Sequence, residues 1–469
     1  MSTSDRPNLL FVFADQLRAR EMDDPASPLI TPAYDRLRAE GQRFTNMVAN
    51  CPVCTPSRAM LLTGQYPLAN RVVANDLPLP EDAVTLGELL SGAGYRTGYV
   101  GKWHLDGSPR AGFTPPGPRR HGFGTWAVHN CIHSYLSSAY YGDEPALKPI
   151  PGYEPAYQTD LAEEFIEAGG GQPWSLFLSW GPPHDPYPQV PGHYQRLYDA
   201  PDLPYPPTWR TDDPGLHPAD GPLRSCNLPW DPESSYRQYL AATTALDDQL
   251  ARLLHALDRS GQAGNTIVVY TSDHGDMLWS HNRMFKQQPW DEAVRVPFVI
   301  RWPGCVPAGA DHEGCLSIAD LAPSLLSLMG LSVPETMEGS DCSAAFCGHD
   351  RVGPESAFLL ELVSCDQSHD MAVPEWRGIR TRQHTYVRTR QAPWLLYDNL
   401  ADPDQQHNLV GRDDTALLRA SLESQLAGWM NRTGDRFEPG EQILRRLELT
   451  NLWNLREGEL HPRAPRLLS

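Results

Sequence analysis

The sequence lacks an apolar segment long enough to cross a membrane, and its first residues, MSTSDRPNLLFVFADQ, do not form a signal peptide. A cytoplasmic location is therefore the default expectation, although an exported chain with a trimmed leader would have the same sequence. An excess of positive charge is also lacking, because 39 Lys and Arg face 58 Asp and Glu, a formal net charge of −19. Such a chain is not drawn to nucleic acid or anionic membranes, so an anionic substrate must be bound by a local cluster of cations.

Cysteine pairs at repeated spacings are missing as well. The nine cysteines are an odd number, which argues against a disulfide framework or a zinc module. We therefore expect most of them to be reduced and buried. An internal repeat and a low-complexity tail are absent too. The 469 residues, 40% of them hydrophobic, can bury a large core and suit one large α/β domain with a smaller appendage.

Short apolar runs alternate with helical patterns through most of the chain. Residues 8–14 (NLLFVFA) and 266–271 (TIVVYT) are typical of strands that are buried on both faces. Thr31 is the predicted N-cap of a helix that begins at Pro32, and a Thr85–Glu88 capping box predicts another helix. The alternation predicts an α/β fold with a large, mainly parallel but mixed sheet sandwiched by helices.

The pattern changes at about residue 370. Short aromatic and β-branched runs follow at 378–382, 385–390 and 394–397, and a helical segment follows near 415–430. We therefore predict a large catalytic domain over residues 1–370. A small α+β domain that carries an antiparallel sheet is predicted over residues 371–469.

The most informative segment is CPVCTPSR at residues 51–58, which continues as AMLLTG. Ordinary explanations are a buried Cys54 before a helix, or a redox-type pair of Cys51 and Cys54. The segment also resembles the signature of the type I sulfatases, Cys-x-Pro-Ser-Arg with a downstream Leu-Thr-Gly. Five matched positions and an independent downstream match favour this resemblance. It extends over nearly the whole chain, and the family belongs to the alkaline phosphatase superfamily.

The resemblance implies an alkaline phosphatase-like fold and hydrolysis of a sulfate monoester of a carbohydrate or small organic molecule. It also implies that a formylglycine-generating maturation enzyme oxidises Cys54 to formylglycine, which Arg58 holds with its fixed donor fork. One hydroxyl of the hydrated aldehyde would attack sulfur, and the other would later lose its proton and eject sulfate by C–O cleavage. Attack and release are thereby separate steps.

Polar residues at two strand ends form a candidate metal site. Asp15 and Gln16 follow the first apolar run, and Asp273 and His274 follow the later one. A single strand-end Asp is more often a helix cap than a ligand. Two such ends, both at places where the sulfatase family keeps its ligands, favour a divalent metal that also contacts Cys54. The metal would help to deprotonate the nucleophile and hold the sulfate oxygens.

These residue pairs depart from the commonest pattern of the family. Many sulfatases carry Asp-Asp and Asp-Asn at the two strand ends, whereas Asp-Gln and Asp-His resemble the choline-sulfatase and phosphonate monoester hydrolase branches. Oxygen-rich ligands favour Ca²⁺. Because Gln16 is neutral and the imidazole of His274 is softer than an amide oxygen, Mn²⁺ is the alternative.

Further candidate catalytic residues lie in segments that match sulfatase motifs. Lys102 and His104 occur in the run GKWHL after a predicted strand, and they would contact the formylglycine and the sulfate. Without the resemblance, Lys102 would be explained as a solvated loop charge. Either His184, in GPPHDP, or Lys286, in MFKQQ, could protonate the leaving oxygen. We favour His184.

The candidate substrate-binding residues are Asn75, His129, His133 and His281. Asn75 and His281 lie in segments that resemble active-site-lining stretches of the same two branches. His129 and His133 belong to the segment 106–145, where aromatic residues mixed with His, Asn and Arg suit a polar, sugar-like or carboxylated ligand. Ordinary structural roles explain all four residues equally well.

Two other functions are compatible with the motifs. Gln16 and His274 also suit a phosphonate monoester or phosphodiester hydrolase with the same nucleophile. A catalytically silent ligand-binding relative is the third hypothesis, but it does not need the full set of motifs. The sequence leaves the organic part of the substrate and the oligomeric state open, and a homo-oligomer is compatible with it.

Overall fold

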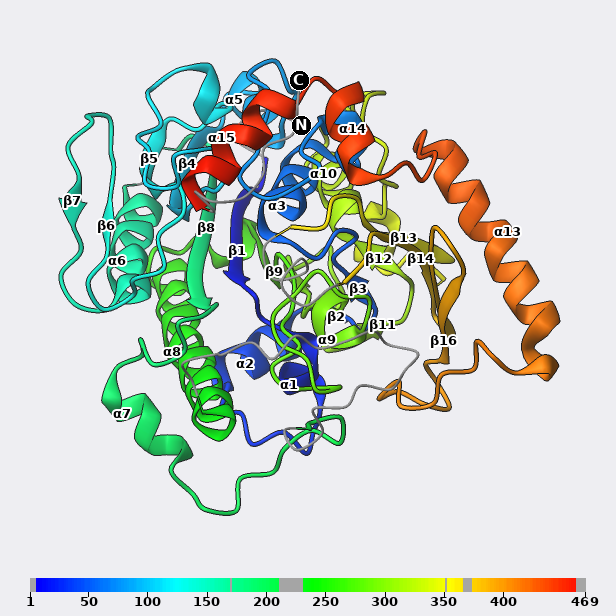
Figure 1. The fold of residues 1–469 in the computed structure, drawn as a ribbon. Helices are drawn as coiled ribbons and strands as arrows, with labels where there is room; N and C mark the ends of the chain where they lie inside the picture. The colour runs from blue at the N-terminus through cyan, green and yellow to red at the C-terminus, as the bar shows by residue number, and fades with distance from the viewer. Residues whose placement is uncertain (1–5, 169–170, 211–230, 351, 366–372, 461–469) are drawn as a thin grey trace.

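The computed structural model describes residues 6–168, 171–210, 231–350, 352–365 and 373–460 (Figure 1). An eight-stranded sheet has the order β11-β2-β10-β9-β1-β8-β4-β5. Adjacent strands from β9 to β5 are parallel, and β10 is antiparallel to both its neighbours. The predicted mainly parallel, mixed sheet is therefore confirmed. The strands are β1 Asn8–Asp15, β2 Gln42–Phe44, β4 Arg96–Lys102, β5 Thr125–His129, β8 Trp174–Pro183, β9 Thr266–Ser272, β10 Val299–Arg301 and β11 Ala310–His312.

The alternating side chains of β1 show why helices cover both faces of this sheet. Leu9, Phe11 and Phe13 belong to one core cluster, whereas Leu10 and Val12 belong to the other. Successive side chains of a strand point to opposite faces, and burial of each is worth about 1.5–3 kcal/mol. The first cluster includes side chains of α3 Cys54–Thr63, α5 Leu86–Gly92 and α10 Leu321–Leu328. The second includes side chains of α2 Pro32–Glu40, α6 Glu154–Glu167 and α8 Pro232–Arg259.

Both predicted helix starts are confirmed. The Thr85–Glu88 capping box is present at the start of α5. Helix α2 begins at Pro32 with Thr31 as its N-cap residue, but the side chain of Thr31 makes no cap hydrogen bond. Instead the carboxylate of Asp247, on α8, accepts hydrogen bonds from the backbone N–H groups of Ala33 and Tyr34, both at 2.8 Å. A tertiary contact therefore supplies the cap.

A separate antiparallel sheet of four strands follows in the order β13-β14-β15-β16. Helix α13 packs against β14 and β15 and forms one edge of the molecule in Figure 1. The first strand of this sheet lies before the predicted domain boundary, which itself falls among residues 366–372, outside the described part of the chain. The two-domain division stays a prediction. The elements are β13 Ser356–Glu361, β14 Trp376–Thr381, β15 His384–Thr389, β16 Pro393–Asp398, α13 Ala416–Arg432, α14 Gly440–Arg446 and α15 Thr450–Leu460.

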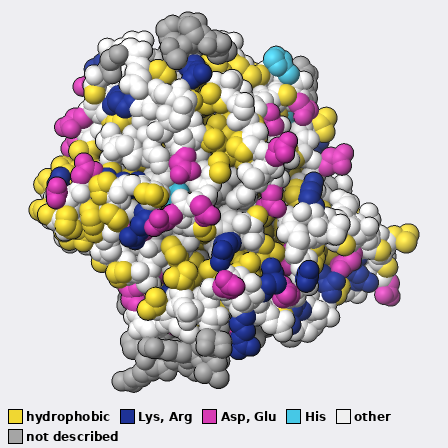
Figure 2. Space-filling view, turned by 90° about the horizontal axis from the view of Figure 1, so that it is seen from above, with side chains coloured by type: hydrophobic (Ala, Val, Ile, Leu, Met, Phe, Trp, Pro, Cys, Tyr) yellow, Lys and Arg dark blue, Asp and Glu magenta, His cyan; other side chains and the backbone are white. Residues whose placement is uncertain are grey.

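The remaining strands and α-helices are short. They are β3 Met47–Val48, β6 Ala139–Tyr140, β7 Lys148–Pro149, β12 Leu316–Ser317, α1 Ala19–Asp23, α4 Pro67–Asn70, α7 Gly192–Gln195, α9 Asp291–Val294 and α11 Ser343–Phe346. Among the described helices, none combines the length and the hydropathy needed to cross a bilayer. The eight cysteines of the described residues are free and six are buried, as expected, whereas Cys226 lies outside those residues. On the face in Figure 2, acidic and basic side chains are interspersed.

Candidate active site at the carboxyl ends of the strands

Four of the candidate residues lie where neighbouring strands of the large sheet end. Asp15 is the last residue of β1, and Asp273 follows β9, the strand beside it. Lys102 ends β4, and His184 follows β8, which lies between β1 and β4. Because parallel strands end at the same edge of a sheet, this is where α/β folds bind ligands. All four side chains are buried.

Cys54 is the first residue of α3, a helix that is buried over its whole length. The N–H of Thr55 donates to Oδ1 of Asn75 at 3.0 Å, and the hydroxyl of Thr55 accepts from the N–H of Asp76 at 3.0 Å. Ser57 Oγ donates to the carbonyl of Asp273 at 2.5 Å. These bonds fix the first turn of the helix against two loops. A helix N-terminus stabilises negative charge, so this location favours an ionised group at position 54.

Side chains of Asp15, Cys54, Asp273 and His274 form one buried cluster whose potential ligand atoms all lie within 4.8 Å of one another. His274 Nδ1 lies 2.9 Å from the carbonyl of Gly275, so Nδ1 must be the protonated donor. Nε2 then faces Sγ of Cys54 at 3.1 Å and Oδ1 of Asp15 at 3.6 Å. Without its proton, this nitrogen is the ring atom that would bind a metal.

The charges of this cluster also suit a cation. Burial and the negative charge of Asp15 raise the pKa of Asp273. Two carboxylates, an imidazole nitrogen and the group at position 54 are a donor set that suits Ca²⁺ or Mn²⁺. A divalent ion would relieve the repulsion between the two carboxylates.

Arg58 ties together the two carboxylates of the cluster. Its Nε donates to Oδ2 of Asp273 at 3.0 Å, and its Nη2 donates to Oδ2 of Asp15 at 3.1 Å. Nη1 donates to the carbonyl of Lys102 and to Ser179 Oγ, both at 2.7 Å. Oδ1 of Asp15 and Oδ1 of Asp273 both lie near His274 Nε2, at 3.6 and 3.7 Å. Oδ1 of Asp273 also accepts the backbone N–H groups of Gln16 at 3.1 Å and His274 at 2.9 Å. Arg58 thus bonds the carboxylates, and its predicted contact with residue 54 is not among these hydrogen bonds.

Gln16 has its side-chain amide between two other polar groups. Its Nε2 donates to Oδ2 of Asp276 at 2.7 Å, and its Oε1 accepts from Lys286 Nζ at 2.7 Å. An amide oxygen has two lone pairs, so one remains for a metal. Ligation by Gln16 stays a prediction.

Two lysines and His274 surround the thiol of Cys54. Lys102 Nζ lies 3.8 Å from Sγ and 2.5 Å from Oδ2 of Asp15. Burial alone would raise the pKa of the Cys54 thiol, but the positive charges of Lys102, Lys286 and His274 lower it well below its usual value. The surroundings therefore stabilise an anion at this position.

His184 lies beside Lys286 at the other side of the cluster. His184 Nδ1 is 2.7 Å from the carbonyl of Asp185, and its Nε2 is 2.5 Å from Lys286 Nζ. Nδ1 is therefore a donor, and Nε2 accepts a hydrogen bond from the ammonium group of Lys286. The ring of His133 stacks on that of His184 with centroids 4.2 Å apart. A proton can thus be held at either of two neighbouring atoms, His184 Nε2 and Lys286 Nζ.

His104 is fully enclosed and bonded to a carboxylate that the sequence analysis did not select. Its Nε2 lies 2.8 Å from Oδ1 of Asp76, and its Nδ1 makes no hydrogen bond within the described residues. Burial lowers the pKa of His104, but the charges of Cys131 and Asp76 outweigh this effect and raise it to about 10. The imidazole therefore has a donor atom available for an anion.

The four predicted substrate-binding residues have different positions. His133 contacts His184 through the stacking of their rings. Asn75 bonds the first turn of α3, as described above. His129 uses Nε2 toward Glu154 at 3.3 Å and Nδ1 toward the N–H of Ile132 at 3.2 Å. His281 stacks on Trp290 and lies 3.5 Å from Glu292. Direct contact with substrate stays a prediction for all four.

Sequence reasoning missed three residues that contact the predicted ones. Asp276 bonds Gln16 and the hydroxyl of Tyr187, Asp76 bonds His104, and the thiol of Cys131 lies 3.3 Å from His133 Nε2. Asp276 is part of the TSDHGD run, so its position beside a candidate ligand pair was an available signal. Asp76 and Cys131 had no such signal because their partners are distant in sequence.

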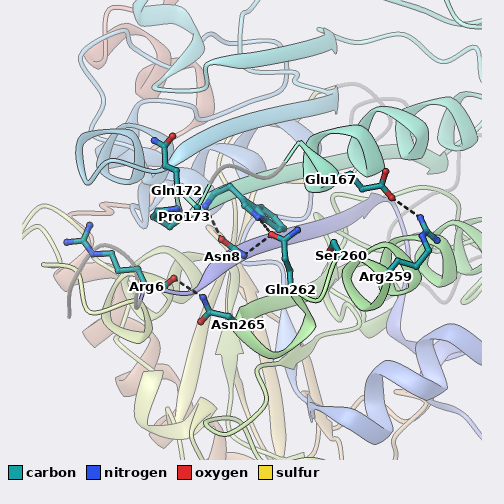
Figure 3. Close-up of a pocket in the computed structure, with 11 residues that line it drawn as sticks. Arg6, Asn8, Glu167, Gln172, Pro173, Arg259, Ser260, Gln262 and Asn265 are labelled. Carbon is teal, nitrogen blue, oxygen red and sulfur yellow. Dashed lines mark hydrogen bonds and ion pairs between the residues drawn. The ribbon is translucent and has the colours of Figure 1, made fainter.

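A cavity of about 620 Å³ lies at the amino ends of the strands (Figure 3). Its lining includes Asn8 at the start of β1, Trp174 at the start of β8 and Asn265 just before β9. Of its charged groups, Arg259 lies 3.1 Å from Glu167, and Arg6 donates to the carbonyl of Ala93 at 2.6 Å. This cavity is therefore separate from the candidate active site, which lies at the carboxyl ends of the same strands.

Known proteins resemble the chain over nearly its whole length. The model of the family described as "Sulfatase" matches residues 7–331, and that of "N-sulphoglucosamine sulphohydrolase, C-terminal" matches residues 276–432. The ulvan-active sulfatase of Formosa agariphila is 34% identical over 448 residues, 94% of this chain and 84% of that protein. The choline-sulfatase of Rhizobium meliloti is 28% identical over 472 residues, 91% of this chain and 88% of that protein.

A solved structure in complex with its substrate D-glucosamine-2-N,6-O-disulfate supports the fold. It superposes with a TM-score of 0.81 at 24% identity and covers 93% of this chain and 100% of that one. At this level of identity the likeness concerns the architecture alone. It agrees with the eight-stranded sheet and the four-stranded C-terminal sheet described above.

Proposed function

Because the chain belongs to the sulfatase family of the alkaline phosphatase superfamily and hydrolyses sulfate esters, we propose that residue 54 is its nucleophile and acts as formylglycine. The observation that carries this proposal is the location of Cys54. It begins α3, and its Sγ lies among Asp15, His274 and Lys102 at 3.7, 3.1 and 3.8 Å. An anion formed there is surrounded by groups that stabilise it.

One divalent metal would be held by Asp15, Asp273, His274 and the group at position 54, with Gln16 as a further ligand. When bound, the metal supplies positive charge that lowers the pKa of the nucleophile and withdraws electrons from the sulfate oxygens. The carboxylate oxygens favour Ca²⁺, and the imidazole makes Mn²⁺ the alternative. Arg58 orients the carboxylates through their Oδ2 atoms.

The chain's own cations complete the proposed site. Lys102, His104 and Lys286 would bind the sulfate group, since each is buried with a donor directed toward position 54 or its neighbours. His184 would protonate the leaving oxygen from Nε2, which Lys286 contacts at 2.5 Å. The short contact gives His184 a neighbouring source of protons.

The proposed substrate is a sulfated saccharide, with a small organic sulfate as the alternative. The relative with 34% identity is named ulvan-active, and the relative with 28% identity is named choline-sulfatase. The ring of His133 stacks on that of His184, the proposed proton donor, so we propose that His133 contacts the organic part of the substrate.

Mass spectrometry of the peptide that contains Cys54 tests the nucleophile. In protein from a host that carries a maturation enzyme, we expect a peptide lighter than the cysteine form, together with hydrolysis of sulfated saccharides. A Cys54→Ala variant should then have no turnover. A persistent thiol in fully active enzyme would overturn formylglycine catalysis.

Phosphonate monoester or phosphodiester hydrolysis is the second candidate function. The pair of Gln16 and His274 favours it, because this pair resembles the phosphonate monoester hydrolase branch. Kinetics of one matured preparation on an aryl sulfate, a phosphonate monoester and a phosphodiester distinguish the two. The sulfate should have the highest kcat/KM, and a dominant phosphonate rate would reverse the assignment.

A further inference from the structure

Asp76 is a buried carboxylate that contacts His104, Arg110 and Arg456. Its Oδ1 accepts from His104 Nε2 and from Arg110 Nε, both at 2.8 Å. Its Oδ2 accepts from Arg110 Nη2 at 2.7 Å and forms an ion pair with Arg456 Nε at 3.4 Å. A carboxylate can only accept, so His104 must carry a proton on Nε2. Because the pKa of His104 is raised to about 10, Nδ1 carries a proton as well.

The segment that carries Asp76 is attached directly to the helix of the nucleophile. The N–H of Asp76 donates to the hydroxyl of Thr55 at 3.0 Å. The N–H of Thr55 in turn donates to Oδ1 of Asn75 at 3.0 Å. Asp76 has a φ of 60°, a left-handed conformation that Asp and Asn tolerate better than most residues. His104 is therefore fixed relative to position 54 through a single short segment.

The C-terminal helix α15 supports this carboxylate from the other side. Arg456 is fully buried, and its Nε donates to the carbonyl of Asn75 at 3.0 Å. Glu459, one turn later, accepts the backbone N–H of Arg110 at 3.0 Å. Arg110 and Arg456 thus offset the negative charge of Asp76, and Arg456 comes from the last described helix of the chain.

We propose that Asp76 is a positioning residue that holds the imidazolium of His104 by its Nε2–H, and that Arg456 of α15 holds Asp76 in place. Nδ1 of His104 makes no hydrogen bond within the described residues, and the imidazole is close enough to the thiol of Cys54 to lower the pKa of that thiol. The proposal rests on the proposed function in one respect, namely that His104 acts on the nucleophile or the sulfate. It assigns a part of the catalytic site to the C-terminal helix, more than 350 residues after His104.

The first test is Asp76→Asn, which keeps the shape and the left-handed backbone. Asn removes the negative charge that stabilises the imidazolium of His104. We expect kcat to fall at least about tenfold, as for other residues that orient catalytic ligands, with KM changed less than about threefold. In ¹⁵N spectra of the imidazole, assigned with His104→Gln, the pKa of His104 should fall, because the charge of Asp76 helps to raise it.

The matched control is Asp435→Asn, because Asp435 is another buried carboxylate that is paired with a buried arginine, Arg377, away from His104. This variant should keep the kcat and the His104 spectrum of the wild type. Arg456→Met is the second test variant, since it removes the support of Asp76 without touching His104. It should lower kcat while far-UV circular dichroism remains unchanged, and Arg456→Lys should recover part of the loss.

His104→Ala separates the two possible failures. If His104→Ala keeps the wild-type kcat, the proposed role of His104 fails. If His104→Ala is inactive while Asp76→Asn and Arg456→Met are folded and retain wild-type kcat, the positioning role of Asp76 is overturned. An unchanged pKa of His104 in folded Asp76→Asn would overturn it as well.

Discussion

Arg58 shows how one side chain organises the acidic half of the site. Its fork bonds Oδ2 of both Asp15 and Asp273, so the same group offsets their charge and directs their Oδ1 atoms toward the cluster. A planar guanidinium can make these two bonds at once, whereas an ammonium is a single point of charge. The CxPSR motif therefore contributes to the metal site as well as to the nucleophile.

We predict that Arg58→Lys weakens metal binding more than it weakens the fold. The lysine can bond one carboxylate at most, so the other is free to turn its oxygens away from the cluster. Loss of a residue that orients metal ligands typically costs about 10–100-fold in affinity. Isothermal titration of the metal-free protein with Ca²⁺ and with Mn²⁺ measures this loss.

Arg377→Lys is the control for this substitution. Arg377 is equally buried, but it forms its salt bridge with Asp435 in the C-terminal part of the chain. Loss of this salt bridge should lower the free energy of unfolding and leave the metal affinity within about twofold of the wild type. Equal losses of affinity in both variants would show that the effect arises from general destabilisation.

At the scale of elements, helix α2 begins at a cap that comes from another helix. Asp247 of α8 bonds the N–H groups of Ala33 and Tyr34, and Thr31 bonds neither. We predict that Asp247→Ala costs about 1–3 kcal/mol, because it leaves two buried donors without partners. Thr31→Ala should cost less than about 0.5 kcal/mol. Urea unfolding of both variants measures the difference, and a larger cost for Thr31→Ala would contradict the assignment.

The imidazole of His121 is buried in a loop that contacts α5, and this burial predicts a dependence of stability on pH. Thr85 Oγ1 donates to the carbonyl of His121 at 3.2 Å, and burial lowers the pKa of this imidazole from 6.5 to about 4. The unfolded chain binds a proton as the pH falls below 6.5, whereas the folded state does so only near 4. The folded state therefore loses stability as the pH falls through this range, and His121 has no such effect above pH 6.5.

His121→Asn removes this titration and tolerates the φ of 44° at the position. Between pH 7.5 and 4.5 the variant should lose about 1–3 kcal/mol less of its free energy of unfolding than the wild type, at about 1.4 kcal/mol per unit of pKa. Urea unfolding at the two pH values checks this. The same substitution at His255, which is exposed on α8, should follow the wild type. Parallel losses in all three proteins would exclude His121 as the cause.

At the scale of the whole molecule, the sequence predicts what depends on local pattern. Apolar runs such as residues 8–14 predict strands, and polar residues after them predict the edge of the sheet at which the candidate site lies. The unpredicted carboxylates Asp247 and Asp76 were missed for a common reason. Their partners, the first turn of α2 for Asp247 and His104 for Asp76, are distant in sequence, and single-sequence patterns contain no information about such contacts.

The candidate metal site joins three elements, and this predicts a link between metal and stability. Its ligand atoms come from the end of β1, the start of α3 and the loop after β9, so a bound ion would cross-link the centre of the molecule. An ion that binds only the folded state adds about 2.7 kcal/mol at 100 times its Kd. Thermal unfolding after chelation and then with Ca²⁺ or Mn²⁺ measures the gain, and the ion with the larger effect at equal concentration is the preferred one.

Asp273→Ala should abolish this stabilisation, because the variant lacks one carboxylate and leaves the cluster with Asp15 alone. Asp320→Asn is the control, since Asp320 is a buried carboxylate that bonds Ser317 and Ser340 instead of the cluster. It should lower the starting stability and keep the full increment on addition of metal. If the metal still stabilised Asp273→Ala, the ion would bind elsewhere. The negative charges of Asp15 and Asp273 would then be offset by Arg58 and Lys102 alone.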